Sequence, residues 1–119
     1  MIEQWHVFQN ISHPIPYYIG KNAQDNKDMI LKSNDDDIWF HAYDQSSCHI
    51  VVKLPDVCFS KKQLNTIIKR GAQLCKQNTN SLKTCENIKV TYCYVGKLQV
   101  DEYQVGSVHI NGNSKTIII

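Results

Sequence analysis

An acid, an indole and an imidazole alternate along one short stretch of this chain of 119 residues, Asp37-Ile38-Trp39-Phe40-His41. Strict alternation predicts a β-strand in which Phe40 points to one face of a sheet and the three polar or aromatic side chains point to the other. Asp37 and His41 would lie about 13 Å apart, because each residue of a strand advances the chain by about 3.3 Å. They cannot form a catalytic pair by themselves, so their partners must come from neighbouring strands or from a ligand.

Cys48 and His49 bring a thiol and a second imidazole close to this strand. A thiolate and an imidazole could form an activated nucleophile, but neighbouring residues of a strand point to opposite faces, so these two cannot pair directly. Cys48 could meet His41 across a hairpin, but no nucleophile motif surrounds either residue. We therefore predict no catalytic residues and no enzymatic activity.

The cysteines do not show the pattern of a metal site. The chain has five of them, and no pair has the spacing of two to four residues that is typical of zinc ligands. An odd number of cysteines without a secretion signal indicates free thiols in a reducing compartment. We predict no metal and no cofactor, and we expect Cys58, Cys75 and Cys93 to be buried as small apolar side chains.

The composition limits the class of protein. The length predicts a single domain over residues 1–119, and a hydrophobic content of 42% is enough for a core. The net charge of +2 is too small to predict nucleic-acid binding from the total alone. No apolar run approaches the roughly 20 residues of a membrane span, and the N-terminus does not resemble a signal peptide. We therefore expect a cytoplasmic protein.

Residues 60–77 predict one long amphipathic helix. Ser60 and Gln63 have the spacing of a capping box at its start, and Asn78 is expected to end it in the left-handed conformation. On a helical wheel the apolar residues share one face, and the adjacent face carries a lysine stripe made of Lys61, Lys62, Lys69 and Lys76. The lysine stripe is either a solvated face or a row of phosphate contacts.

The remaining segments predict a sheet and a short helix over residues 22–33. Expected strands cover residues 2–9, 16–20, 37–43, 49–54, 88–95, 105–110 and 115–119. Gly20 is expected to turn the chain with a positive φ, and Asn111-Gly112 predicts a hairpin between the last two strands. The predicted fold class is α+β, a largely antiparallel mixed sheet with one long amphipathic helix and one short helix.

The second face of this sheet would differ in character from the core face. If the long helix covers Phe40, the opposite face carries Asp37, Trp39, His41, His49 and Lys53. An uncovered face of this composition is typical of a base-stacking surface, although the N-terminal segment could equally cover it. Gly20-Lys21-Asn22 could hold an anion on its backbone N–H groups or form a plain turn, and it lacks the pattern of a P-loop.

Several of these stretches occur together in a known family. The ordered motifs are Tyr18-Ile19-Gly20-Lys21-Asn22, Asp25-Asn26, Asp37-Ile38-Trp39-Phe40-His41 and Ser47-Cys48-His49-Ile50-Val51. With Val90-Thr91-Tyr92 and Val105-Gly106, they make residues 16–119 similar to the NFACT-R domain. The resemblance implies a non-enzymatic RNA-binding module that acts in translation and ribosome-associated quality control.

The resemblance and the lysine stripe together define the predicted site. The expected nucleic-acid-binding residues are Lys21, Asn22, Asp37, Trp39, His41, His49, Lys53, Lys61, Lys62, Lys69 and Lys76. The expected partners are RNA (rRNA or tRNA) or another nucleic acid, and ribosome-associated proteins, with no membrane. These 119 residues lack the large N-terminal domain and coiled coils of NFACT proteins, so tRNA recruitment and tailing of stalled chains are not predicted. The alternative is a protein-interaction or scaffold domain with no nucleic-acid ligand.

Overall fold

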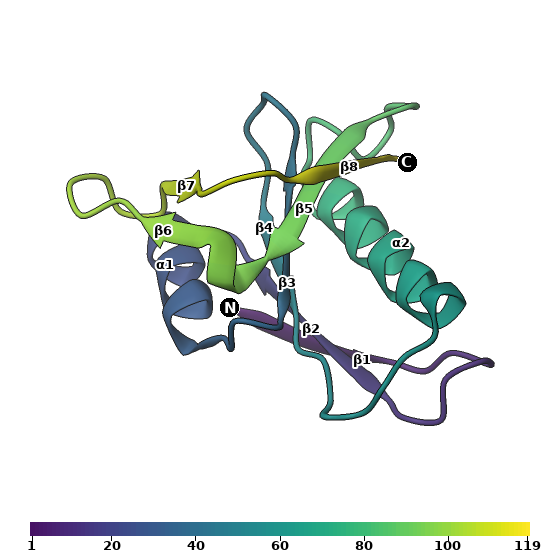
Figure 1. Cartoon of the computed structure of the whole chain (residues 1–119). Helices are drawn as coiled ribbons and strands as arrows, with labels where there is room; N and C mark the ends of the chain where they lie inside the picture. Colours follow the sequence, from purple (N-terminus) through teal and green to yellow (C-terminus); the bar gives the residue numbers. More distant parts are fainter.

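A computed structural model describes all 119 residues and confirms the α+β class (Figure 1). The elements follow the chain as β1 (Ile2–His6), β2 (Ile15–Gly20), α1 (Ala23–Lys32), β3 (Ile38–Ala42), β4 (His49–Val52), α2 (Lys61–Gln77), β5 (Lys89–Tyr94), η1 (Val95–Lys97), β6 (Leu98–Val100), β7 (Val108–Ile110) and β8 (Lys115–Ile118). Neither α-helix has the length and apolar character that crossing a membrane requires.

The main sheet places β3 near its centre. Its six strands run in the order β1-β2-β4-β3-β5-β8, and every neighbouring pair is antiparallel. β3 and β4 form an antiparallel hairpin, in which Phe40 lies opposite Ile50. On its other edge β3 pairs with β5, where Phe40 lies opposite Tyr92. Because β3 has neighbours on both sides, its position is determined by two ladders of backbone hydrogen bonds.

Helix α2 covers one face of this sheet, as the sequence predicts. The Ser60 side chain accepts from the Gln63 N–H at 3.1 Å, and the Gln63 side chain accepts from the Ser60 N–H at 2.9 Å, so the capping box is formed. Phe40 and Ile67 are fully buried between helix and sheet. A Cβ at Gly71 would lie only 2.3 Å from the Phe40 ring, so a glycine is what allows α2 to approach β3 this closely.

The second face of the sheet is also covered, and not by the N-terminal segment. Met29 and Ile30 of α1 pack with Val95 against Trp39 and Val51. The small sheet of β6 and β7 adds further apolar side chains to the same cluster. Figure 1 shows α1 and the β6–β7 pair on the side of the sheet away from α2. The face that the sequence left open is therefore a second, smaller core.

The prediction of a hairpin between the last two strands is wrong. β7 pairs with β6, whereas β8 crosses to the main sheet and pairs with β5. Gly112 does adopt a positive φ of 89°, as a turn at Asn111-Gly112 requires, but the turn redirects the chain between two sheets. The strand β6 lies between two expected strands, in a segment for which the sequence predicted no strand. Three residues give too little periodicity to recognise.

Two local predictions are also wrong. Asn78 ends α2 with φ −94° and ψ 8°, outside the left-handed region, and its side chain accounts for the end by donating to the Leu74 carbonyl at 2.8 Å. Gly20 does not have a positive φ. The position requires a residue without a side chain, because a Cβ there would lie 2.3 Å from Oδ1 of Asn26 and 2.9 Å from Cε of Met29. Gly20 thus allows α1 to pack on β2.

Candidate nucleic-acid interface

Trp39 lies in the smaller core and cannot stack on a base in this structure. It is only 3% exposed, and its indole N–H donates to Nδ1 of His49 at 3.1 Å. The His41 ring stacks on the indole with centroids 5.7 Å apart and planes 5° from parallel. Trp39 thus contacts His41 through its ring face and His49 through its N–H, both within the fold.

Asp37 is a buried structural acid. Its Oδ2 accepts from the Asn34 N–H at 2.9 Å, and its Oδ1 accepts from the Leu54 N–H at 3.1 Å. Its own carbonyl accepts from the Val95 N–H at 2.8 Å. The carboxylate therefore joins the turn before β3 to the chain leaving β4, and its oxygens are already engaged without a base edge.

His41 and His49 line a cavity of about 260 Å³ together with Trp39 and residues 106–108. Burial lowers the pKa of both imidazoles, and the neighbouring His41 contributes to lowering the pKa of His49 to about 3. His49 is therefore neutral, which leaves Nδ1 free to accept from Trp39. No group of three or more Cys, His, Asp or Glu side chains is placed to hold a metal ion.

Three polar residues of the predicted site lie at the start of α1 or on the chain after β4. Asn22 is the N-cap of α1, and its Oδ1 accepts from the Asp25 N–H at 2.8 Å. Lys53 donates to the Lys32 carbonyl at 3.1 Å. Asn22 and Lys53 thus have structural roles, whereas Lys21 is exposed.

Lys21 lines a polar cavity of about 390 Å³ that also contains Cys48. The Cys48 thiol donates to the Cys75 carbonyl at 3.3 Å. Hydrogen bonding from the Cys75 thiol lowers the pKa of Cys48, helped by Thr79 and the Lys21 charge, while the same contact raises the pKa of Cys75. All five thiols are free. The expectation that Cys58 is buried is wrong, because it lies exposed on the loop before α2.

The lysine stripe of α2 is solvent-facing over most of its length. Lys61, Lys62 and Lys69 are exposed, and Lys76 is half-buried near the end of the helix. Lys61 also lines a cavity that other elements help to form. The stripe therefore contributes Lys61 to a recessed site at the start of the helix, and its other three lysines do not line that site.

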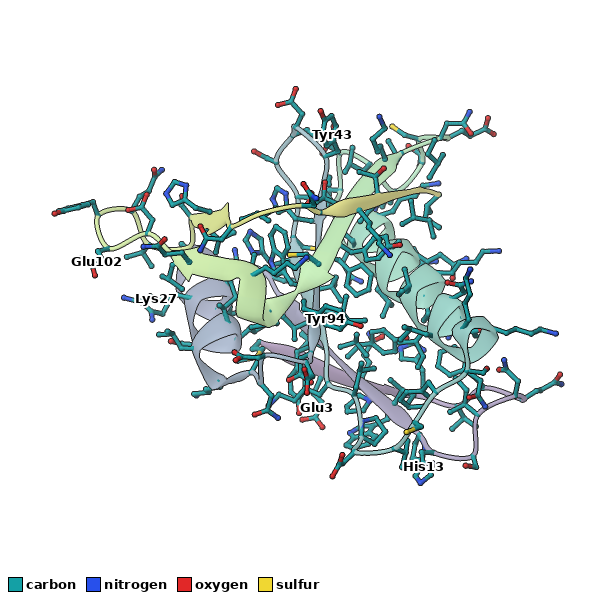
Figure 2. All side chains as sticks on the ribbon, viewed as in Figure 1. Glu3, His13, Lys27, Tyr43, Tyr94 and Glu102 are labelled. Atoms are coloured by element: carbon teal, nitrogen blue, oxygen red, sulfur yellow. The ribbon has the colours of Figure 1, made fainter.

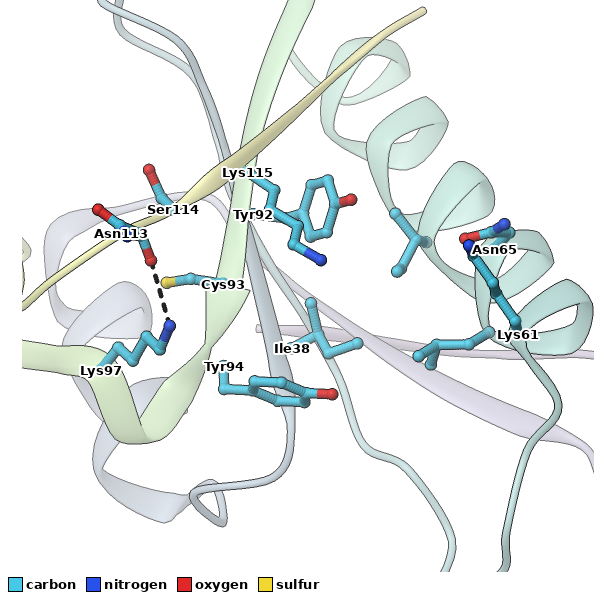
Figure 3. A pocket seen from close by; sticks show the side chains of 12 residues that line it. Ile38, Lys61, Asn65, Tyr92, Cys93, Tyr94, Lys97, Asn113, Ser114 and Lys115 are labelled. Atoms are coloured by element: carbon cyan, nitrogen blue, oxygen red, sulfur yellow. Dashed lines mark hydrogen bonds between the residues drawn. The ribbon is translucent and has the colours of Figure 1, made fainter.

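That recessed site is a groove of about 250 Å³ between α2 and the β5–β8 edge of the sheet (Figure 3). Its lining residues are Ile38, Lys61, Leu64, Asn65, Ile68, Tyr92, Cys93, Tyr94, Lys97, Asn113, Ser114 and Lys115. Figure 3 shows the Tyr92 and Tyr94 rings projecting from β5 toward α2, with Ile38 between them. Tyr92 is half-buried beside Phe40, and Tyr94 is 46% exposed.

The groove is basic and contains no acid. Lys61 comes from α2, Lys97 from η1 and Lys115 from β8, and no Asp or Glu is among the lining residues. Lys97 donates to the Asn113 carbonyl at 3.3 Å, which holds the chain before β8 against η1. In Figure 2, Glu102 lies at the far end of the β6–β7 connection, well away from Tyr94. Lysines around exposed aromatic rings are the combination that binds phosphates and bases.

The sequence gives little sign of this groove. Of the residues just described, only Lys61 was predicted as a contact; Tyr92, Tyr94, Lys97 and Lys115 were not. They lie on segments that are far from α2 in the chain, and the pairing of β8 with β5 brings Lys115 to the site. The alternation of Tyr92 and Tyr94 along β5 was the one available signal, because such residues share a face.

The model of the NFACT protein RNA-binding domain matches residues 4–112. The chain belongs to this family. As an NFACT-R domain it carries the signature Asp37-Ile38-Trp39-Phe40-His41 in β3. The structure shows that these side chains build the centre of the fold, since Asp37, Trp39 and Phe40 are all buried.

This NFACT-R domain is similar to parts of two relatives and of one solved structure, all of which are longer than the matched region. It is 31% identical over 84 residues to coiled-coil domain-containing protein 25 of Danio rerio, covering 69% of this chain and 40% of the relative. A homologue of that protein in Dictyostelium discoideum is 31% identical over 77 residues, covering 65% of this chain and 36% of the relative. The match thus spans well under half the length of either relative.

The C-terminal region of the fibronectin/fibrinogen-binding protein from Streptococcus suis has the same fold. The TM-score is 0.72 at 22% sequence identity, and the match covers 88% of this chain and 40% of the other. At this identity the likeness supports the architecture of the NFACT-R domain alone.

Proposed function

We propose that this chain is an RNA-binding module that holds RNA phosphates along the groove between α2, β5 and β8. The observation that carries the proposal is the convergence of Lys61, Lys97 and Lys115 from three separate elements on a groove without an acid. A recessed cluster of one sign raises the local concentration of a polyanion more than isolated surface lysines do. Lys62 and Lys69, exposed on the adjoining face of α2, extend the basic surface.

Family membership favours RNA over other polyanions. The family is an RNA-binding domain family and not a catalytic one, and we propose that this chain, acting as a single domain, likewise has no enzymatic activity. Apart from Lys53, which donates to the Lys32 carbonyl, the remaining predicted lysines are Lys21 and Lys76, and we assign them to peripheral phosphate contacts. The burial of Trp39 and Asp37 moves the proposed base-contacting surface away from β3.

The cellular setting of the proposal follows from the family alone. NFACT-R domains imply a ribosomal RNA or tRNA partner, and we propose a role in cytoplasmic translation and ribosome-associated quality control, with ribosome-associated proteins as further partners. A ribosome pull-down with wild-type protein and with Lys61→Glu/Lys115→Glu checks this setting. Retention of the wild type and loss of the variant at the same protein concentration is the expected result.

Fluorescence polarisation with labelled tRNA, ribosomal RNA fragments, and single- and double-stranded DNA tests RNA binding directly. Each titration is run at two salt concentrations, because phosphate contacts make affinity fall with salt. The variant Lys61→Glu/Lys115→Glu should lose binding, and Lys83→Glu is the matched control, since Lys83 is exposed on the loop after α2. Equal losses in variant and control, or no binding of any RNA by the wild type, would refute the proposal.

A protein-interaction role is the second candidate. The edge strand β1 exposes Trp5 (59%) and is followed by Val7 (80%), and an unpaired strand edge can accept a strand from another chain. A protein partner bound through this edge would persist at high salt and would be lost on Trp5→Ala. Salt-resistant protein binding without RNA binding would favour this candidate over the first.

A further inference from the structure

The groove has an apolar floor beneath its charged rim. Among its lining residues, Ile38 of β3 and Ile68 of α2 are almost fully buried and Leu64 of α2 is half-buried. Lys61, Lys97 and Lys115 line the same groove and are exposed (Figure 3). Phosphates are contacted by charged and polar groups. Phosphate binding alone therefore does not account for this apolar floor. The floor indicates a planar, largely apolar group that enters the groove.

The size of the groove limits that group. Pockets for drug-sized ligands have volumes of about 300–1,000 Å³, and the groove has about 250 Å³. The groove is thus smaller than a pocket for a drug-sized ligand, which favours one nucleobase over a base pair as its occupant. Tyr92 and Tyr94 supply two aromatic rings from one face of β5, and aromatic rings are the surfaces on which single-stranded bases stack.

Polar groups at the rim can contact the edge of such a base. Asn65 projects from α2, and Asn113 and Ser114 lie on the chain before β8 (Figure 3). An amide offers both a donor and an acceptor, so it can match the Watson–Crick edge of an unpaired base. The contact between Lys97 and the Asn113 carbonyl keeps this side of the groove in place.

We propose that the groove binds a single unpaired nucleobase against Tyr94, so that the domain prefers single-stranded to double-stranded RNA. This inference rests on the proposed function, because it assumes that RNA reaches the groove. Bases in a duplex are stacked and paired, and they cannot enter without being flipped out at a cost in free energy. Lys61, Lys97 and Lys115 then hold the phosphates that flank the inserted base.

The test compares three labelled ligands of equal length and charge: an unstructured single-stranded RNA, an RNA of rearranged sequence that closes into a hairpin duplex with an abasic loop, and a fully abasic oligonucleotide. We expect the single strand to bind at least tenfold more tightly than the duplex or the abasic strand. Tyr94→Ala should weaken binding of the single strand by between about 5-fold and 150-fold, the range of one base–aromatic stack, whereas Tyr94→Phe should retain most of the affinity.

Tyr103→Ala is the matched control, because Tyr103 is 97% exposed on the β6–β7 connection. It should leave binding unchanged. Melting curves of the Tyr94 variants exclude unfolding as the cause of a loss. Equal affinity for the abasic strand and the single strand, or full affinity in Tyr94→Ala, would overturn the base pocket. If the lysine variants still lost binding in that case, the proposed function would stand without it.

Discussion

Trp39 and His49 are joined by a buried hydrogen bond of 3.1 Å, from the indole N–H to Nδ1 of the imidazole. The bond connects β3 to β4 on the face of the sheet that α1 and the β6–β7 pair cover. Both residues belong to motifs that resemble the NFACT-R family, and this geometry explains their presence by packing. The side chains on both faces of β3 therefore lie in hydrophobic cores.

Trp39→Ala should destabilise the protein about as much as Phe40→Ala does. Each substitution removes a buried aromatic ring, and each should lower the free energy of unfolding by roughly 3–5 kcal/mol. Urea unfolding of both variants measures this, with Trp5→Ala as the control because Trp5 is mostly exposed. A Trp39→Ala protein with normal stability and weakened RNA binding would instead restore Trp39 as a binding residue.

Asp37→Asn should lower the free energy of unfolding by about 1–3 kcal/mol, because an amide cannot accept on both of its polar atoms. One of the two N–H groups that Asp37 now satisfies, from Asn34 or Leu54, loses its acceptor. Asp36→Asn is the matched control on the exposed side of the same turn. RNA affinity at a temperature where both proteins are folded should not change, and a selective loss of RNA affinity would contradict the structural role.

Stability should fall when the pH drops below about 6.5. The folded pKa of His49 lies near 3, below its usual value of 6.5, so the unfolded chain takes up a proton first as the pH falls. The stability is fully present above pH 6.5 and declines toward pH 3 by up to about 1.4 kcal/mol per pH unit. His41 and His6, whose pKa values burial also lowers, act in the same direction.

Urea unfolding at pH 7.5 and pH 5 measures this dependence. His49→Gln should reduce it, because the amide oxygen can still accept from Trp39 but does not titrate. His13→Gln is the control, since His13 is exposed. A dependence as steep in His49→Gln as in the wild type would mean that another group is responsible.

Lys61→Gln and Lys115→Gln should each reduce the salt dependence of RNA binding. Loss of one phosphate contact changes the log–log slope of affinity against salt by about 0.7 for a single strand. Lys76→Gln should change the slope less, because Lys76 lies at the other end of α2 and does not line the groove. Polarisation titrations over a range of salt concentrations give the slopes. Slopes equal to that of the wild type in all three variants would mean that these lysines are solvated and do not contact phosphates.

Cys48 should react with iodoacetamide at a lower pH than an ordinary cysteine. Because the Cys75 thiol and Lys21 stabilise the Cys48 thiolate, its alkylation should reach half its maximum rate below about pH 8.5, the pKa of a free thiol. Peptide mass spectrometry reports each cysteine separately. Cys75→Ala should raise that midpoint and Cys93→Ala should not. Thiol counting on the unfolded protein without reductant should find all five cysteines as free thiols. An unchanged midpoint in Cys75→Ala would exclude the thiol contact as the cause.

Local patterns determined much of the fold from the sequence. The period of the apolar residues and the Ser60–Gln63 capping box are properties of consecutive residues, so helix α2 could be placed almost to the residue. The alternation along β3 correctly oriented Phe40 toward that helix. The motifs around Gly20, Asp37 and His49 were sufficient to indicate the family.

Only the tertiary structure decided what covers the second face of the sheet and which strands pair at the end of the chain. A strand pattern shows which side chains share a face, but the choice of covering element depends on competition among distant segments for the same apolar surface. That competition buries Trp39 under α1 and sends β8 to β5 instead of β7. It also brings Lys61, Lys97 and Lys115 together around Tyr94, because a groove between three elements exists only once each has packed against the others.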